Sequence, residues 1–339
     1  MENKILTISV AAYNLENLIA ENMESFIKCK ERNNLEVIVT DDGSNDKTAG
    51  VVENYQDKYP EIIKLIKKKN EGAGSTVNSG IKNATGKYFK MIDGDDWTNP
   101  EDLDKLINKL KDIDADMVIT NYSTYDNSMQ KIIDRTKYEL EEGKEITLGN
   151  ACKNNQFQMH NILYKTSILK TNNIVLDNGF YTDMEYLLLP VPYIKKVIYY
   201  DLDVYVYRIA REGQSVSLPS MKKNIEMHKL VLSRLLDFYE ENKNNLENKS
   251  AEYMVRRISD MADTQLATLL TFNIDKKQVQ KIKDFFEYMK KYDDVYICFK
   301  KGKKEKLLLR SNFKLAKIAS KIVLKKIYKQ WGEKWQGNQ

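Results

Sequence analysis

Residues 87–100, KYFKMIDGDDWTNP, contain three aspartates within four positions, directly after an apolar run and directly before a helix start. The run at 87–92 is typical of a strand. Asn99 before Pro100 predicts a helix N-cap with proline at the first helical position, followed by two acids in the positively polarised first turn. The stretch therefore predicts a strand, an acidic loop and a helix in direct succession.

Crowding three carboxylates into the acidic loop, residues 93–96, has an electrostatic cost. Two like charges this close repel by roughly 1 kcal/mol in water and by about four times as much near a partly buried surface. We therefore expect either raised carboxyl pKa values or a bound cation. Ligands of open α/β sheets bind at the carboxyl ends of the strands, which is where this loop lies.

The first 125 residues alternate short β-branched runs with amphipathic segments, a pattern typical of helices covering a mostly parallel sheet. The predicted strands are residues 5–12, 35–40, 62–66, 87–92 and 116–122. The predicted helices are residues 16–31, 46–58, 74–84 and 100–112. The expected fold class is α/β, with a mostly parallel twisted sheet flanked by helices.

The chain divides by pattern into four regions. Residues 1–125 have the alternating strand-helix pattern, and residues 126–218 are irregular, with aromatic strand-like runs. Residues 219–297 are rich in Lys, Glu and Leu and predict a helical C-terminal extension, which leaves open a homodimer through that region. Residues 298–339 form a basic amphipathic tail.

Composition restricts the class of protein. The chain has 339 residues, of which 42% are hydrophobic, enough for a sizeable core. Its three cysteines are odd in number and far apart, which fits neither a disulfide framework nor a zinc site and favours a reducing cytosol. The N-terminus lacks the pattern of a secretion signal, and the longest apolar region, residues 187–207, is interrupted by Pro190 and Pro192. We expect a cytoplasmic protein, soluble or peripheral to a membrane.

The basic charge lies in the tail. Residues 300–339 hold a net charge of +11, whereas the rest of the chain is at −6. On a helical wheel, the apolar residues of the tail share one side: Leu315, Ile318, Ala319, Ile322 and Val323. The lysines share another side: Lys314, Lys317, Lys321 and Lys325. Such a helix either packs on its own domain or binds an anionic membrane surface. Nucleic acid is disfavoured, because the −6 body predicts no basic groove and no recognition motif is present.

Four polar stretches follow predicted strands: AAYN at 11–14, DDGSNDKT at 41–48, NEGAGSTVNSG at 70–80 and DGDDW at 93–97. Tyr13 offers a flat face for a base, Asp42 an acceptor for a ring N–H, Asp93 an acceptor for ribose hydroxyls and Asp95 a hard oxygen ligand for Mg²⁺ or Mn²⁺. Turn chemistry alone also explains residues 41–44. The third glycine of a dinucleotide fingerprint and a Walker lysine are both missing.

Together, ISVAAYN, EVIVTDDGSNDKT, NEGAGSTVNSGIKNATGKY and MIDGDDW resemble the successive nucleotide-sugar motifs of family 2 glycosyltransferases, which have the GT-A fold, here of a bacterial polysaccharide type. The resemblance covers residues 5–125. It implies that residues 1–125 are the Rossmann-like, nucleotide-sugar-binding half of the domain and that residues 126–218 are the acceptor-binding and catalytic half. It implies that Asp93 and Asp95 form the metal-binding DxD element, with Asp95 the direct ligand and Asp96 in support. It also implies nucleotide-sugar contacts from Ala11, Tyr13, Asn14, Asp42, Asn70, Gly74, Asn78, Lys90, Asp93 and Gly94.

Two later stretches extend the resemblance. GFYTDMEYLLLPVPYI resembles the block that holds the catalytic base, which implies Asp183 in that role, with Glu185 as the alternative base and a helix cap as the plain structural alternative. YVYRIAREGQSVS resembles a loop that closes over the diphosphate and implies contacts from Arg208, Arg211, Gln214 and Ser215. One departure is Val77, where relatives often have arginine, and Lys90 or Arg211 is the expected substitute.

The function expected from these motifs is inverting transfer of a sugar from a UDP-sugar to an acceptor hydroxyl, assisted by Mn²⁺ or Mg²⁺. The acceptor expected is a lipid-linked or growing cell-surface saccharide at the inner face of the cell membrane. The alternatives are a metal-dependent nucleotidyltransferase and a non-catalytic nucleotide-sugar binder. His160 is expected in the core or an acceptor pocket rather than on the metal.

Overall fold

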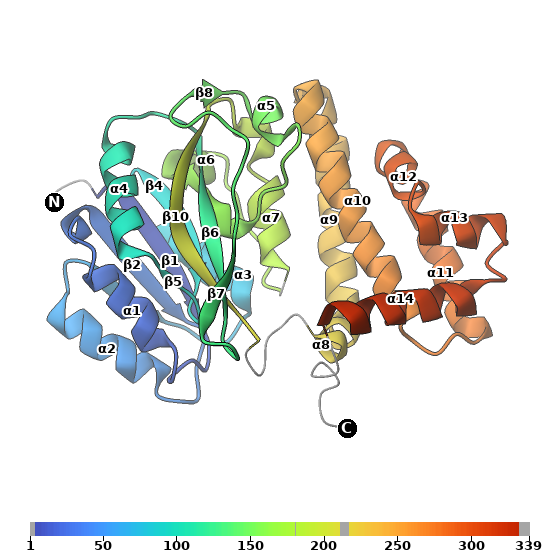
Figure 1. The fold of residues 1–339 in the computed structure, drawn as a ribbon, viewed down its shortest axis with the longest axis horizontal. Helices are drawn as coiled ribbons and strands as arrows, with labels where there is room; N and C mark the ends of the chain where they lie inside the picture. The colour runs from blue at the N-terminus through green and yellow to red at the C-terminus, as the bar shows by residue number, and fades with distance from the viewer. Residues whose placement is uncertain (1–3, 180, 211–216, 332–339) are drawn as a thin grey trace. The chain divides into compact units, whose positions relative to one another are not determined.

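The computed structural model describes residues 4–179, 181–210 and 217–331. The described residues up to 210 form one compact unit, and those from 217 onward form a second. The first unit is an α/β sheet structure and the second is helical, as the sequence predicts (Figure 1).

The first unit is built on one mixed sheet with the order β3-β2-β1-β4-β9-β6-β10-β5, to which β7 and β8 attach through β6 and β10. The strands are β1 Leu6–Ala12, β2 Leu35–Asp41, β3 Ile63–Lys67, β4 Tyr88–Asp93, β5 Trp97–Thr98, β6 Met117–Asp126, β7 Lys131–Arg135, β8 Glu145–Ile146, β9 Ile162–Lys165 and β10 Val197–Ile209. Strands β3, β2, β1 and β4 run parallel, and β6 runs parallel to β10. The five predicted strands are all present, which confirms the expected fold class.

Helices cover both faces of this sheet. They are α1 Ile19–Ile27, α2 Thr48–Lys58, α3 Ala73–Asn83, α4 Pro100–Lys111, α5 Leu148–Cys152, α6 Thr166–Thr171 and α7 Thr182–Leu188, with 3-10 turns η1 Arg32–Asn34, η2 Met159–Asn161 and η3 Val191–Tyr193. Figure 1 shows α1, α2 and α4 on one face and α3, α6 and α7 on the other. The core between the layers is apolar because inward strand residues such as Ile8, Val10 and Val37 are fully buried.

The helix boundaries follow local hydrogen bonds. The Asn99 side chain accepts from the backbone N–H groups of Glu101 and Asp102, which confirms the predicted N-cap of α4. Helix α1 begins at Ile19 rather than at residue 16. The Leu15 N–H donates to Thr48 Oγ1 at 2.6 Å, and the N–H of residue 16 donates to Asp46 at 3.1 Å, so the loop after β2 holds these residues outside the helix.

Strand β9 is the main element that the sequence pattern does not reveal. It pairs antiparallel with both β4 and β6 and so lies between two strands that are parallel to each other. Apart from β10, the strands within residues 127–218 have only two to five residues, which is too short for a clear alternating pattern. Only the aromatic run that becomes β10 was recognisable in advance.

The second unit consists of α8 Leu218–Lys223, α9 Ile225–Asn242, α10 Asn248–Leu270, α11 Lys276–Met289, α12 Asp293–Phe299, α13 Lys303–Arg310 and α14 Ala316–Trp331, with η4 Lys243–Asn245. From residue 303 to residue 331 the basic tail forms two helices, α13 and α14, because Asn312 and Phe313 have positive φ and interrupt the helical path. Among the described residues, no helix combines the length and the hydropathy that a membrane crossing requires.

Candidate active site

The register of three parallel strands brings the sequence motifs to one edge of the sheet. β1 pairs with β2 and with β4, and these pairings oppose Ala12 to Asp41 and Ala11 to Asp93. The Gly94 N–H donates to the Ala11 carbonyl at 3.0 Å, and a Cβ on Gly94 would lie 2.7 Å from that oxygen. Glycine is needed at this position because the acidic loop passes so close to the end of β1.

The three acids of the loop have unequal surroundings. Asp93 and Asp95 are half-buried, whereas Asp96 is 2% exposed. Asp96 accepts hydrogen bonds from the Tyr205 hydroxyl at 2.5 Å and from the Arg208 N–H at 2.7 Å. Burial, and after it the charges of Asp95 and Asp93, raise the pKa of the Asp96 carboxyl well above its ordinary value. Asp96 therefore holds the loop from inside, and the other two acids lie nearer to solvent.

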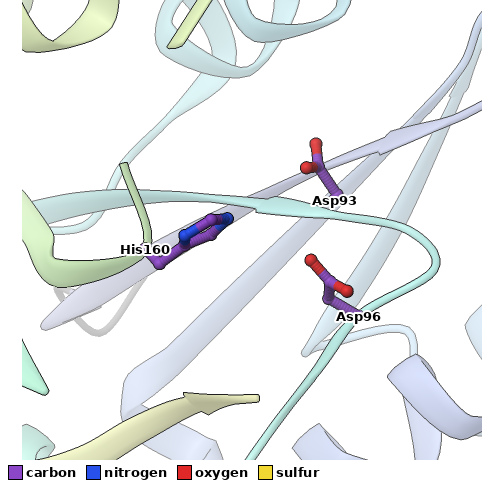
Figure 2. Close-up of side chains that lie close together, drawn as sticks. All are labelled: Asp93, Asp96 and His160. Atoms are coloured by element: carbon purple, nitrogen blue, oxygen red, sulfur yellow. The ribbon is translucent and has the colours of Figure 1, made fainter. Parts of the chain in front are cut away.

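His160, contributed by η2, lies against the acidic loop, as Figure 2 shows. Donor atoms of Asp93, Asp96 and His160 all lie within 4.8 Å of one another. The imidazole stacks on Tyr207, with 4.5 Å between ring centroids. Burial, and then the nearby Lys90 charge, lower the pKa of His160 to about 3, so the ring is neutral at pH 7. The sequence did not predict this neighbourhood, because only the position of β9 brings residue 160 beside residue 93.

Lys90, predicted as a phosphate or sugar contact, is fully buried. Its ammonium donates to the His160 carbonyl at 2.7 Å and lies 5.4 Å from the Tyr205 ring centroid. Burial lowers the pKa of Lys90 to about 7. This lysine fastens η2 to β4 from inside the sheet, and its ammonium is not displayed at the surface as a replacement for the arginine missing at Val77.

Arg208 braces the acidic loop. It is 5% exposed, and its Nε donates to the Asp95 carbonyl at 2.8 Å. One terminal nitrogen donates to Asn127 Oδ1 at 2.9 Å, another forms an ion pair with Glu21, and the guanidinium lies 4.5 Å from the Trp97 ring centroid. The predicted lid contacts Arg211, Gln214 and Ser215 lie outside the described residues.

The polar residues after β1 and β2 form a second part of the site. Asp42, 4% exposed, accepts from the backbone N–H of Glu71 at 3.0 Å and of Gly72 at 2.8 Å. It thereby fixes the loop that contains Asn70, whose own side chain is exposed. Tyr13 is 46% exposed at the end of β1, in position to offer its ring to a ligand.

Asn14 joins the first two motifs to each other. It has a φ of +52°, its N–H donates to the Ser44 hydroxyl at 2.9 Å, and its side-chain oxygen accepts from the Asn45 N–H at 2.9 Å. Asparagine tolerates this left-handed backbone better than most residues. Asn14 therefore holds the AAYN and DDGSNDKT stretches together.

The two candidate bases differ in burial. Asp183 lies in the first turn of α7 and is half-buried. Glu185 is fully buried, and its carboxylate accepts the Asp177 N–H at 2.6 Å. The exposure of Asp183 makes its carboxylate the more accessible of the two to an acceptor hydroxyl.

Residues 7–171 match the family model described as Glycosyl transferase family 2. This chain contains a family 2 glycosyltransferase domain. The chain is 27% identical to Glycosyltransferase GlyA of Streptococcus pneumoniae, over 67% of this chain and 33% of GlyA. It is 33% identical to Putative glycosyltransferase EpsH of Bacillus subtilis, over 40% of this chain and 38% of EpsH. The matched region thus spans well under half of these relatives.

The fold has a solved counterpart. Residues 1–349 of Staphylococcus aureus TarS, in complex with UDP-GlcNAc, are similar with a TM-score of 0.65 and 20% sequence identity, over 96% of this chain and 92% of that one. At this level of identity the similarity shows the fold alone: a GT-A domain followed by a helical region.

In the glycosyltransferase domain, α3 is crossed by the segment that leads to α7. The Asn78 side chain donates to the Leu176 carbonyl and accepts the Leu176 N–H, each at 2.8 Å. A Cβ on Gly74 would lie 1.6 Å from the Asp177 carbonyl oxygen, and one on Gly72 would lie 1.7 Å from that of Asn178. Asn78 and Gly74 are predicted nucleotide-sugar contacts, and each also has a structural role. Gly74 leaves room for the segment that precedes Asp183, and Asn78 binds that segment by hydrogen bonds.

This crossing gives a prediction on stability. Gly74→Ala should lower the free energy of unfolding by at least about 1–3 kcal/mol, because the added methyl group overlaps a backbone carbonyl that has little room to move. The matched control is Gly50→Ala in α2, where an added Cβ meets nothing within 4 Å. That change should be neutral or stabilising by about 0.4–1 kcal/mol. Urea unfolding of both variants measures the difference, and equal stabilities would contradict the role assigned to Gly74.

The donor set at the acidic loop fits a divalent cation. Two carboxylates and a neutral imidazole are acceptable ligands for first-row divalent ions, and carboxylates for Mg²⁺. Asp93 belongs to the group of three donors within 4.8 Å, whereas Asp95, the ligand implied by the DxD element, lies outside that group. Asp93 is therefore the acid common to both arrangements. Both oxygens of Asp96 already accept hydrogen bonds from Tyr205 and Arg208.

Proposed function

We propose that this chain is an inverting glycosyltransferase that moves a sugar from a UDP-sugar to an acceptor hydroxyl. The observation that carries the proposal is the strand register, which gathers the ends of β1, β2 and β4 at one edge in a domain of this family. The UDP-GlcNAc complex of the similar TarS fold supports a uridine nucleotide as the donor.

Binding of the donor is assigned to the same edge. Tyr13 would stack on the base, Asp42 would accept from the ring N–H beside the backbone groups it already holds, and Asp93 would accept from ribose hydroxyls. A divalent cation held by Asp95 and Asp93 would neutralise the diphosphate as it leaves. Arg208, through its bond to the Asp95 carbonyl, keeps the acidic loop in place for this.

Transfer is a single displacement at the anomeric carbon. The acceptor oxygen forms a bond to that carbon while the bond to the diphosphate oxygen breaks, and UDP departs with the electron pair. Asp183 takes the proton of the acceptor hydroxyl as positive charge develops on the attacking oxygen. One displacement inverts the anomeric configuration.

The acceptor proposed is a lipid-linked or growing cell-surface saccharide, which would place the enzyme at the inner face of the cell membrane. This proposal rests on the basic, partly apolar C-terminal helices of the second unit and on the family assignment. A homodimer through the helical region, residues 219–297, is compatible with it.

The decisive experiment is a calorimetric screen of UDP-sugars, GDP-sugars and nucleoside triphosphates, each with Mn²⁺, Mg²⁺ or EDTA. We expect metal-dependent binding of UDP and of one UDP-sugar, with slow hydrolysis of that donor. Preference for a nucleoside triphosphate would indicate a nucleotidyltransferase instead. Binding of a UDP-sugar without hydrolysis or transfer to any saccharide would indicate a non-catalytic binder.

A further inference from the structure

The last helix of the second unit has two different apolar sides. α14 packs inward through Ala316, Ala319, Ser320 and Val323, each at most 8% exposed, and contacts α10. Ile318 and Ile322 lie on its other side and are 49% and 56% exposed. The apolar set drawn from the helical wheel is therefore divided: Ala319 and Val323 belong to the core of this unit, and the isoleucines do not.

A basic hollow of about 510 Å³ lies between α13 and the start of α14. Its lining consists of Lys303, Lys306, Leu307, Arg310, Ser311 and Leu315. Lys303, Lys306 and Arg310 recur at helical spacing along one side of α13 and are exposed, whereas Glu305 and Leu308 on its other side are buried. Among the residues that the structure describes, the lining contains three cations and no acid.

Leu315 links the hollow, which it lines, to the side of α14 that carries the isoleucines. The Ile318 N–H and the Ala319 N–H both donate to the Leu315 carbonyl, so Leu315 lies at the first turn of α14. Ile318 and Ile322 follow Leu315 by three and seven positions, which places all three on one side of the helix. The basic-apolar surface is defined here as Lys303, Lys306, Arg310, Leu315, Ile318 and Ile322.

We propose that the basic-apolar surface docks on an anionic phospholipid bilayer. Residues 300–339 have a net charge of +11, which complements anionic headgroups, and each basic side chain near such a surface strengthens binding. Leu315, Ile318 and Ile322 are aliphatic, and aliphatic side chains between cations suit the headgroup and acyl boundary. Nucleic acid would instead favour aromatic side chains for stacking on bases.

The basic-apolar surface takes its cations from α13, whereas the helical wheel took them from the lysines of α14. Docking through this surface does not depend on the transfer chemistry. Its test is sedimentation of the full chain with sucrose-loaded vesicles, either phosphatidylcholine alone or phosphatidylcholine with 30% phosphatidylglycerol. We expect binding to the anionic vesicles only, weakened by added salt. Equal partitioning to both compositions, or to neither, overturns the proposal.

Two sets of variants locate the surface. Lys303→Gln, Lys306→Gln and Arg310→Gln together should weaken vesicle binding on the order of 100-fold. The control removes the same charge from exposed lysines of the first unit, Lys28→Gln, Lys64→Gln and Lys82→Gln, and should change binding by less than about threefold if location matters more than total charge.

The apolar part has a closely matched control. Ile318→Ser with Ile322→Ser should weaken binding about tenfold, whereas Leu230→Ser with Ile297→Ser should leave it unchanged. The control residues belong to the same unit and are 56% and 47% exposed, close to the exposures of the tested pair. Equal effects of the two pairs, or binding of a 20-mer DNA duplex in place of vesicles, overturns the proposal. Circular dichroism and UDP calorimetry of each variant show that both units are folded, so a failure here is separate from a failure of the proposed enzyme activity.

Discussion

Asp95→Ala should reduce kcat/KM for transfer from the UDP-sugar by about 10³-fold or more, which corresponds to about 4 kcal/mol of lost transition-state stabilisation. The reason is that the carboxylate proposed to hold the cation is removed, so the diphosphate departs without its neutralising charge. Metal-dependent UDP binding, measured by calorimetry with and without EDTA, should weaken by more than about tenfold. The fold should persist, because Arg208 bonds the main-chain carbonyl of residue 95 rather than its side chain.

The control for Asp95 is Glu101→Ala, an exposed acid in the first turn of α4. It removes a negative charge from the same region and should leave both transfer and UDP affinity within about twofold. Activity of Asp95→Ala at the wild-type level would refute the metal assignment. If His160→Asn abolished metal-dependent UDP binding while Asp95→Ala did not, the cation would belong to the group of Asp93, Asp96 and His160.

Asp183→Asn should lower kcat by about 10²–10⁴-fold and leave the affinity for UDP unchanged. The amide has nearly the shape of the carboxylate, but it cannot take up the proton of the acceptor hydroxyl near neutral pH. The donor is proposed to bind at the ends of β1, β2 and β4, and Asp183 has no proposed contact with the nucleotide. The affinity for UDP is therefore not expected to change. Steady-state kinetics together with UDP calorimetry separate the two effects.

Glu185→Gln is the matched variant for this test. Its remaining side-chain oxygen can still accept the Asp177 N–H, so the loop before α7 keeps its hydrogen bond. We expect kcat to fall by less than about tenfold, with some loss of stability. A large loss of kcat in Glu185→Gln and a small one in Asp183→Asn would transfer the role of base to Glu185.

The acidic loop shows how far the sequence alone reaches. The succession of strand, three acids, N-cap and helix was recognisable in residues 87–100, and the structure confirms each of these elements. Local signals were sufficient because hydrogen bonds between residues two or three apart, such as that from the Glu101 N–H to Asn99, fix this geometry. The positions of the predicted strands followed from the same kind of short-range pattern.

Residues that meet from distant parts of the chain were not predictable in this way. Arg208 joins Glu21, Asn127 and the Asp95 carbonyl, and none of these contacts was predicted. Its expected contact with the donor stays a prediction. Tyr205, whose hydroxyl holds Asp96, had no distinguishing signal beyond its place in an aromatic strand. The residues in these contacts are more than 80 positions apart, and one amino-acid sequence does not indicate which distant residues meet.

The sequence by itself determined the fold class, the motifs that follow the parallel strands, the family resemblance and the position of the basic tail. Only the tertiary structure decided that β9 enters between β4 and β6, which brings His160 to Asp93, and that α14 buries Ala319 and Val323 while it exposes Ile318 and Ile322. The physical reason is the range of the interactions: periodicity and capping act within a few residues, whereas strand insertion and helix packing depend on which distant surfaces bury one another.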